Sequence, residues 1–203
     1  QLYEQSPILE VKGLQKTFSQ GKQSHVALHK INFYIYPGET LGLVGSSGSG
    51  KSTLGNCLLK LTQPDEGEIH YMGTRIDKLK GAHLQQYRKD IQLIFQDPFS
   101  SLNPKKKIGH MLTEPMLVHN IGKNKHDRVD RAIQLLEQVG LEASHINYYP
   151  HMFSGGQRQR IGIARALAVE PKLIVCDESV SALDRSVQAH VLNLLNKLKE
   201  TYA

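Results

Sequence analysis

The sequence contains little cysteine. Its 203 residues include only Cys57 and Cys176, which is too few for the disulfide framework of a small secreted protein. Both cysteines fall on apolar faces of predicted core elements, so we expect reduced core residues in a cytosolic protein. A chain of this length buries roughly 70% of the surface that its unfolded form exposes. One domain can therefore form without a disulfide.

Membrane and export segments are also missing. No apolar run approaches the ~18 residues of a membrane span, and no signal peptide opens the chain. We therefore expect a protein that is soluble by itself. The first residue is Gln1 rather than Met, which indicates a fragment.

The net charge of +6 excludes little, because a basic balance is compatible with nucleic acid, an anionic membrane surface or a nucleotide. The only tight basic run in the sequence is Lys105–Lys107. No aromatic residues are interleaved with these lysines to stack bases, so we interpret the run as a solvated loop. We expect no nucleic-acid partner.

A glycine-rich stretch dominates the sequence and fits the pattern G-x-x-x-x-G-K-[ST] at every fixed position. It consists of Gly45, Ser46, Ser47, Gly48, Ser49, Gly50, Lys51, Ser52 and Thr53. Residues 40–44 before it form an apolar run typical of a buried strand, and apolar residues at helical spacing follow it. A strand, a glycine turn and a helix start together aim backbone N–H groups and a helix dipole at one point, which suits a polyphosphate.

Two other interpretations of this stretch fit poorly. A flexible linker gives no reason for Lys51 and Ser52 between a buried strand and an amphipathic helix. A dinucleotide fingerprint fails because residues 48–53 lack the last glycine of G-x-G-x-x-G. In a phosphate-binding loop, Lys51 would reach the outer phosphates and Ser52 the magnesium ion.

Three short segments predict a small antiparallel sheet: Ile8–Val11, Ile31–Ile35 and Glu68–Met72. Phe18 lies between the first two, at the edge of a polar excursion. An aromatic ring in that place can stack an adenine, a contact worth ~1 to 3 kcal/mol. Ordinary packing explains it equally well, so the residues alone leave both interpretations open.

The segment after the next apolar strand changes character. That strand, Ile91–Phe95, leaves Gln96 at the rim of the sheet, where ligands bind. Loops then alternate with helical patterns at residues 108–117 and 129–139, which predicts an inserted helical subdomain. Residues 124–127 match the N-K-x-D motif of GTPases. Because they lie in a polar stretch rather than after a buried strand, we interpret Asp127 as a helix cap.

A second helix start has the composition of an anion site. Its residues are Ser154, Gly155, Gly156 and Gln157, followed by apolar residues at helical spacing as far as Ala168. An N-cap explains the serine, but paired glycines weaken a helix by ~1 kcal/mol each unless something must approach closely. Two phosphate sites in one chain indicate that a triphosphate is shared between two molecules.

A pair of carboxylates follows four apolar residues. The run Leu173–Cys176 predicts a buried strand, and Asp177 and Glu178 come at its end. An acid at this place beside a phosphate loop is the usual holder of Mg²⁺, which fits Asp177. Glu178 would then lie next to the γ-phosphate and orient or deprotonate the attacking water.

These motifs carry a family resemblance that covers essentially the whole chain. The sequence resembles the nucleotide-binding domain of ATP-binding cassette (ABC) transporters. The resemblance rests on Gly45–Thr53, Gln96, Ser154–Gln157, Asp177 with Glu178, and a turn made of Ser181, Ala182, Leu183 and Asp184. Residues 95–104 and 149–153 look most like the ATP-binding subunits of bacterial dipeptide, oligopeptide and nickel importers.

The resemblance implies an α/β fold of the P-loop NTPase class. It implies a RecA-like parallel-sheet core with a small antiparallel β subdomain and an inserted helical subdomain. Residues 1–203 would be one ABC ATP-binding domain truncated at the C-terminus. Within it, residues 1–97 and 158–203 would form the ATP-binding core and residues 98–157 the helical subdomain.

The resemblance also implies that the ligands are ATP and Mg²⁺. Phe18 would contact the adenine, Val26 the ribose, and the loop from Gly45 to Thr53 the phosphates. Glu178 would be the catalytic residue.

Further roles follow for the metal and for a second subunit. Ser52, Gln96 and Asp177 would hold Mg²⁺. Ser154–Gln157 would be the signature that binds the ATP of the partner subunit, and Ser181–Asp184 the D-loop at the dimer contact.

The implied assembly is a head-to-tail dimer, homomeric or heteromeric, on the cytoplasmic face of the inner membrane. Gln96 would couple it to integral membrane permease subunits, with an extracytoplasmic solute-binding protein as an indirect partner. Hydrolysis of ATP would then power uptake of peptides, nickel or related small solutes. The alternatives are a soluble ABC-type ATPase acting on nucleic acid or ribosomes and a module that binds ATP without turnover. A short helical subdomain with no long coiled coil speaks against the first of these.

The sequence departs from the family pattern at two places. Ser179 follows Glu178 where the family usually has proline, with little expected effect. The switch histidine of a Ser/Thr-His-Asp stretch is absent from the sequence. Because charges around the γ-phosphate carry most of phosphoryl transfer, we expect this fragment to bind MgATP but to hydrolyse it poorly.

Overall fold

The computed structural model describes residues 6–37, 41–43, 50–94 and 102–177. The chain divides into two compact units, each described here by itself. Of the described residues, those up to 93 together with 172–177 belong to the first unit, and residues 94 and 102–171 belong to the second. The second unit includes residues 158–171, which the sequence analysis assigned to the ATP-binding core.

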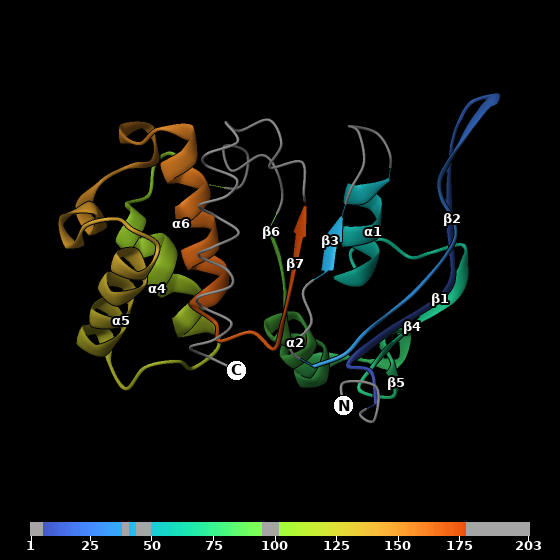
Figure 1. Ribbon diagram of the computed structural model, residues 1–203, viewed down its shortest axis with the longest axis horizontal. Helices are drawn as coiled ribbons and strands as arrows, with labels where there is room; N and C mark the ends of the chain where they lie inside the picture. Colours follow the sequence, from blue (N-terminus) through green and yellow to red (C-terminus); the bar gives the residue numbers. More distant parts are fainter. Residues whose placement is uncertain (1–5, 38–40, 44–49, 95–101, 178–203) are drawn as a thin grey trace. The chain divides into compact units, whose positions relative to one another are not determined.

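The first unit contains an antiparallel sheet with the strand order β2-β1-β4-β5 (Figure 1). Its strands are β1 (Leu9–Gln20), β2 (Gln23–Ile35), β4 (Glu66–Tyr71) and β5 (Thr74–Arg75). The predicted small antiparallel sheet is therefore confirmed. A 3-10 turn, η2 (Ile76–Lys78), follows β5.

The polar stretch after Phe18 forms the outer part of the two longest strands. Strands β1 and β2 continue through it as one hairpin whose tip carries Gly21 and Lys22. Most of the outer residues of β2 are exposed, so no apolar alternation marks them as strand. Cross-strand backbone hydrogen bonds, rather than burial, hold this part of the hairpin.

A second sheet in this unit has the order β3-β7-β6. Its strands are β3 (Leu41–Leu43), β7 (Leu173–Asp177) and β6 (Ile91–Ile94). β3 and β7 pair in parallel, as the family resemblance implied for the core sheet. Helix α1 (Lys51–Leu58) lies beside β3 in Figure 1, and Gly50 at its start packs against Ala27 and Leu28 of β2.

Helix α2 (Gly81–Asp90) was not predicted. Only Leu84 and Tyr87 interrupt its polar sequence with large apolar side chains, so its periodicity is weak. The Tyr87 hydroxyl donates a hydrogen bond to the carbonyl oxygen of Leu58, and Arg88 Nε donates to the carbonyl oxygen of Leu59 at 3.0 Å. Side chains of α2 thereby satisfy carbonyl groups at the C-terminal end of α1.

The core of the first unit joins both sheets to α1 and α2. Its fully buried members include Leu9, Leu14, Ile35, Leu58, Tyr87 and Ile91. Cys57 belongs to the same core and is a free thiol, which confirms the prediction for this cysteine. Burial raises the pKa of the Cys57 thiol, as expected for an inert packed side chain.

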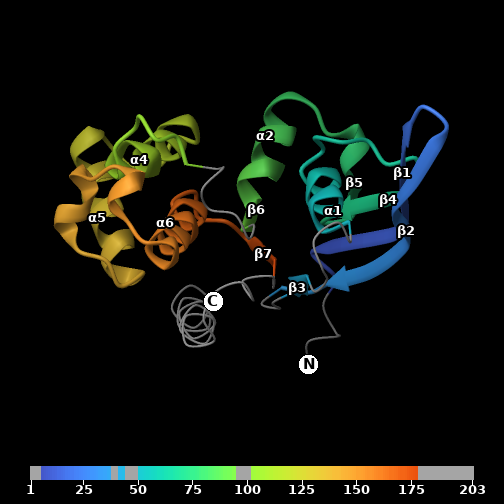
Figure 2. The same ribbon diagram turned by 90° about the horizontal axis from the view of Figure 1, so that it is seen from above.

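The second unit is helical (Figure 2). Its helices are α4 (Ile108–Val118), α5 (Lys125–Gln138) and α6 (Gly155–Leu167), with short 3-10 segments η3 (Ala143–Asn147) and η4 (Pro150–Met152). All three helices were predicted from their periodicity. The cap of α5 was assigned wrongly: Asn124 is the N-cap and accepts from the Asp127 backbone N–H at 2.9 Å, whereas Asp127 lies in the first turn.

No helix within the described ranges combines the length and the apolar character that a bilayer crossing requires.

Candidate functional site

The start of α1 has the geometry of an anion site. Lys51 is the first helical residue, and Gly50 before it is the N-cap, with φ 95° and ψ 4°. Gly50 supplies no side-chain cap, and the first turn of α1 contains no acidic residue. The leading N–H groups of a helix have no partner within the helix. This end of α1 therefore presents N–H groups and the positive end of the helix dipole to an anion.

Gly50 is held against the β1–β2 hairpin. Lys16 pairs with Leu28 and Thr17 with Val26, so Ala27 is the extra residue of a β-bulge. A Cβ atom at Gly50 would clash with the Ala27 carbonyl oxygen and approach the Leu28 side chain to 3.3 Å. The bulge thus fixes where the phosphate loop enters its helix.

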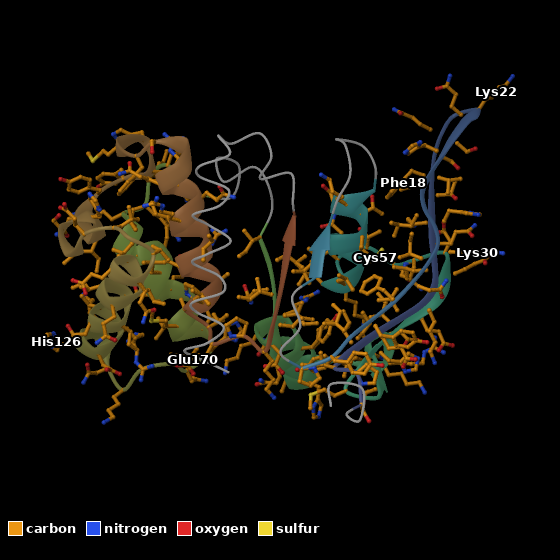
Figure 3. The ribbon with its side chains drawn as sticks, viewed as in Figure 1. Phe18, Lys22, Lys30, Cys57, His126 and Glu170 are labelled. Atoms are coloured by element: carbon orange, nitrogen blue, oxygen red, sulfur yellow. The ribbon has the colours of Figure 1, made fainter. Side chains whose placement is uncertain are left out.

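The predicted base and ribose contacts lie on this hairpin. Phe18 and Val26 are large apolar side chains that are 47% and 50% exposed. The register pairs Phe18 with His25 and Val26 with Thr17, which are adjacent cross-strand pairs. Figure 3 shows Phe18 on the hairpin and Cys57 on α1. An aromatic ring and an aliphatic side chain thus stand exposed on the hairpin whose strand β2 contacts the start of α1.

Two residues that the sequence analysis did not single out contact this part of the hairpin. Lys16 Nζ lies over the Phe18 ring, 5.3 Å from its centroid. Asp65 accepts a hydrogen bond from Lys16 Nζ at 3.2 Å and another from the Thr17 backbone N–H at 2.7 Å. Because Asp65 is 49 residues from Lys16 in the chain, no local sequence pattern could reveal the contact.

The end of β7 lies beside the end of β3. In the β3–β7 register, Asp177 is the partner of Leu43, and the stretch that begins at Gly45 follows Leu43 almost at once. The carboxyl ends of parallel strands meet at one edge of the sheet. Asp177 therefore lies at the carboxyl end of the sheet, opposite Leu43, two residues before Gly45 in the sequence.

The second helix start lies in the second unit and is capped by its own residues. Ser154 is the N-cap of α6, and its Oγ accepts from the Gln157 backbone N–H at 3.3 Å. The Gln157 side chain accepts in return from the Ser154 backbone N–H at 3.0 Å. This capping box uses Ser154 Oγ only as an acceptor, so the hydroxyl hydrogen is left to donate to a ligand. Gly155 and Gly156 form the first turn with no side chain in the way.

Aromatic side chains hold the chain that leads into α6. Phe153 is buried and makes edge contacts with His145 and a tilted contact with Tyr148, at centroid distances of 5.1 and 5.8 Å. Arg158 Nε donates a hydrogen bond to the Pro150 carbonyl oxygen at 2.8 Å. The residue before Ser154 is thereby anchored, which fixes the direction in which α6 begins.

The remaining predicted site residues lie outside the described part of the chain. They are Gly45, Ser46, Ser47, Gly48, Ser49, Gln96, Glu178, Ser181, Ala182, Leu183 and Asp184. Among the residues that the structure does describe, no three histidine, cysteine, aspartate or glutamate side chains form a cluster able to hold a metal ion.

Comparison with known proteins identifies the family. The model of the family described as "ABC transporter" matches residues 28–181. The oligopeptide transport ATP-binding protein OppF of Streptococcus mutans is 53% identical over 193 residues, which are 95% of this chain and 63% of that protein. The glutathione import ATP-binding protein GsiA of Pectobacterium atrosepticum is 49% identical over 204 residues, 97% of this chain and 32% of that protein.

Solved structures agree with the sequence comparison. The dimeric bacterial ABC transporter cassette MJ0796 superposes with a TM-score of 0.83 at 34% identity, over 95% of this chain and 83% of that one. The same cassette in a post-hydrolysis dimer bound to ADP and Pi gives a TM-score of 0.82 at 33% identity, with the same coverage. The expected α/β P-loop fold is thereby confirmed.

The chain spans 63% of the OppF protein and 32% of the GsiA protein. The family model nevertheless covers more than half of this chain, and the matched region contains the start of α1, the start of α6 and strand β7. The resemblance inferred from the motifs is confirmed, and the chain belongs to the ABC transporter family.

Proposed function

We propose that this chain is the ATP-binding and hydrolysing subunit of an importer that moves peptides, or nickel or related small solutes, through partner membrane subunits. The observation that carries the proposal is the juxtaposition of the start of α1 with the hairpin that exposes Phe18 and Val26. That arrangement offers a phosphate site and an apolar base site side by side. The names of the OppF and GsiA relatives support the class of solute.

Each part of the nucleotide has a matching part of the chain. The N–H groups at the start of α1 and the Lys51 ammonium would bind the phosphates. Phe18 would stack the adenine and Val26 would contact the ribose. Glu178 would orient the attacking water and accept its proton.

Magnesium fits the oxygen donors that this chain provides. Ser52 lies in the first turn of α1, and β7 brings Asp177 to the edge where the phosphate loop begins. A hydroxyl, the Gln96 amide oxygen and a carboxylate are the kinds of ligand that Mg²⁺ accepts. When bound by Ser52, Gln96 and Asp177, the ion would neutralise charge on the phosphates.

The start of α6 would complete the site of a second ATP-binding subunit. Its Ser154 hydroxyl and glycine-lined first turn form an anion site separate from the one at α1. Two such sites in each chain are explained by a head-to-tail dimer, with Ser181–Asp184 at the dimer contact. The solved cassette dimer supports this assembly. The dimer is homomeric or heteromeric.

The dimer would bind peripherally to permease subunits at the cytoplasmic face of the inner membrane. Gln96 would link the nucleotide to these subunits, and a solute-binding protein would act through them.

The test is ATP turnover and solute uptake by the full-length protein assembled with its membrane subunits in vesicles. Peptides, glutathione and Ni²⁺ are supplied in turn, and Glu178→Gln is the matched control because it keeps the shape of the side chain and loses the base. Uptake that depends on ATP and is lost in Glu178→Gln supports the proposal. ATP binding without turnover would instead indicate a regulatory module, and turnover stimulated by nucleic acid would indicate the soluble alternative.

A further inference from the structure

The carboxylate of Asp65, in the turn before β4, contacts the β1–β2 hairpin. Asp65 Oδ2 accepts from the Thr17 backbone N–H at 2.7 Å, and Asp65 Oδ1 accepts from Lys16 Nζ at 3.2 Å. The Thr17 N–H and the Lys16 ammonium lower the pKa of the Asp65 carboxyl. The side chain is therefore ionised at working pH and holds the backbone of β1 directly before Phe18.

Lys16 connects this carboxylate to the aromatic ring. Its side chain is only 18% exposed, and its ammonium lies over the Phe18 ring at 5.3 Å from the centroid, within the range of a cation–π contact. One face of the ring is thus occupied by Lys16, while Phe18 as a whole stays 47% exposed. The opposite face is where a planar ligand can stack.

We propose that Asp65 is a positioning residue for the nucleotide base: it fixes Lys16 and the strand at Thr17, and thereby holds the Phe18 ring ready for stacking. The proposal rests on the proposed function, since it requires that Phe18 stacks the adenine.

Ordering Phe18 and Lys16 before the base binds should strengthen nucleotide binding. A ring and a lysine that are already ordered lose little conformational freedom when the base binds, so less of the stacking free energy is offset. Removing Asp65 frees Lys16 to leave the ring and loosens the backbone at Thr17. The loss should affect binding of the base more than binding of the phosphates, because Asp65 contacts Lys16 and Thr17 on β1, whereas Gly50 packs against Ala27 on β2.

The experiment measures the contributions of the base and of the phosphates to binding separately. Calorimetry on the full-length protein measures dissociation constants for MgATP, MgADP and magnesium tripolyphosphate, which lacks a base. For Asp65→Ala we expect about three- to tenfold weaker binding of both nucleotides, the cost of ordering one freed side chain when the base binds. Tripolyphosphate binding should stay within about twofold, and KM for ATP should rise with kcat unchanged. Asp65→Asn, which keeps an acceptor for Thr17, should show a smaller loss.

A double-mutant cycle tests the route through Phe18. In a Phe18→Ala background, Asp65→Ala should have no further effect on nucleotide binding. The matched control is Asp77→Ala, which removes the exposed carboxylate that pairs with Arg75 at 3.0 Å beside the same sheet; it should leave all three affinities unchanged.

The outcomes are distinguishable. Unchanged nucleotide affinity in Asp65→Ala overturns the inference, and so does an equal loss of nucleotide and tripolyphosphate, which would mean a general structural role. An undiminished effect in the Phe18→Ala background also overturns it. If the unaltered protein binds tripolyphosphate but not ATP, or binds neither, the proposed function itself fails.

Discussion

The carbonyl oxygen of Ala27 occupies the space that a side chain on Gly50 would need. The contact joins the extra residue of a β-bulge to the N-cap of α1. It explains why the last glycine of the phosphate loop cannot be exchanged for another small residue: the position has a positive φ and also faces the backbone of another strand.

Replacing Gly50 with alanine is therefore expected to cost more than an ordinary glycine replacement. A left-handed conformation costs a non-glycine residue ~1 to 2 kcal/mol, and the clash with Ala27 adds to it, so the free energy of unfolding should fall by more than ~2 kcal/mol. Gly73→Ala is the control, because Gly73 has φ 82° and open space around its Cβ position. Urea denaturation measures both. Equal losses would show that the hairpin yields to the new methyl group.

Lys51→Ala should weaken ATP binding. Each charge-assisted hydrogen bond that the ammonium makes with a phosphate is worth ~1.5 to 3 kcal/mol, so the affinity should fall at least about tenfold. Lys22→Ala, at the exposed tip of the hairpin (Figure 3), removes the same charge without touching the site. Calorimetric titration compares the two. Unchanged affinity in Lys51→Ala would refute the assignment of the phosphate loop.

Ser154→Ala should distinguish the capping of α6 from the proposed binding of the partner subunit's ATP. Loss of an N-cap side chain costs ~1 kcal/mol of stability, and Asn124→Ala removes the equivalent cap of α5 at 2.9 Å from its partner. Both variants should lose similar stability in urea denaturation. Only Ser154→Ala should lower ATP-dependent dimerisation and steady-state phosphate release. If Asn124→Ala lowers them as much, the effect of Ser154 is no more than helix stability.

Alkaline pH should destabilise the first unit through Tyr71 and Tyr87. Burial, followed by the hydrogen bond that Tyr71 donates to Asp90 at 2.5 Å, raises the pKa of Tyr71, and burial raises the pKa of Tyr87. The unfolded chain releases these protons near pH 10 while the folded chain keeps them. Their contribution is therefore full below about pH 10 and is lost as the pH rises further, by up to ~1.4 kcal/mol per pH unit for each tyrosine.

Tyr71→Phe tests this pH dependence. In urea denaturation between about pH 9 and 11.5, the free energy of unfolding of this variant should fall less steeply with pH, because one of the two buried tyrosines no longer titrates. Its stability at neutral pH should also be lower, because the buried Asp90 carboxylate loses a hydrogen-bond donor. Tyr34→Phe is the control, since Tyr34 is 52% exposed. A slope that stays the same in Tyr71→Phe would contradict the linkage.

The parts of the candidate site that could be predicted are those encoded by short, continuous stretches of sequence. The start of α1, the buried strand before Asp177 and the helix after Ser154 each combine an apolar run with specific residues at its end. The outer hairpin could not be predicted, because exposed residues such as Ser24 and His25 are strand only through their cross-strand partners. The contact of Asp65 with Lys16 was equally hidden, since it joins residues far apart in the chain.

Helix α1 is held at both ends. Gly50 packs against the Ala27 backbone at one end, and Tyr87 and Arg88 bind carbonyl groups at the other. No part of α1 can fray without breaking contacts with β2 or α2. From Leu54 onward, beyond the first N–H groups, its amide hydrogens should therefore exchange with deuterium only when the whole first unit unfolds. If α1 binds the phosphates as proposed, it would then transmit nucleotide binding as a rigid body, without a local melting step of its own.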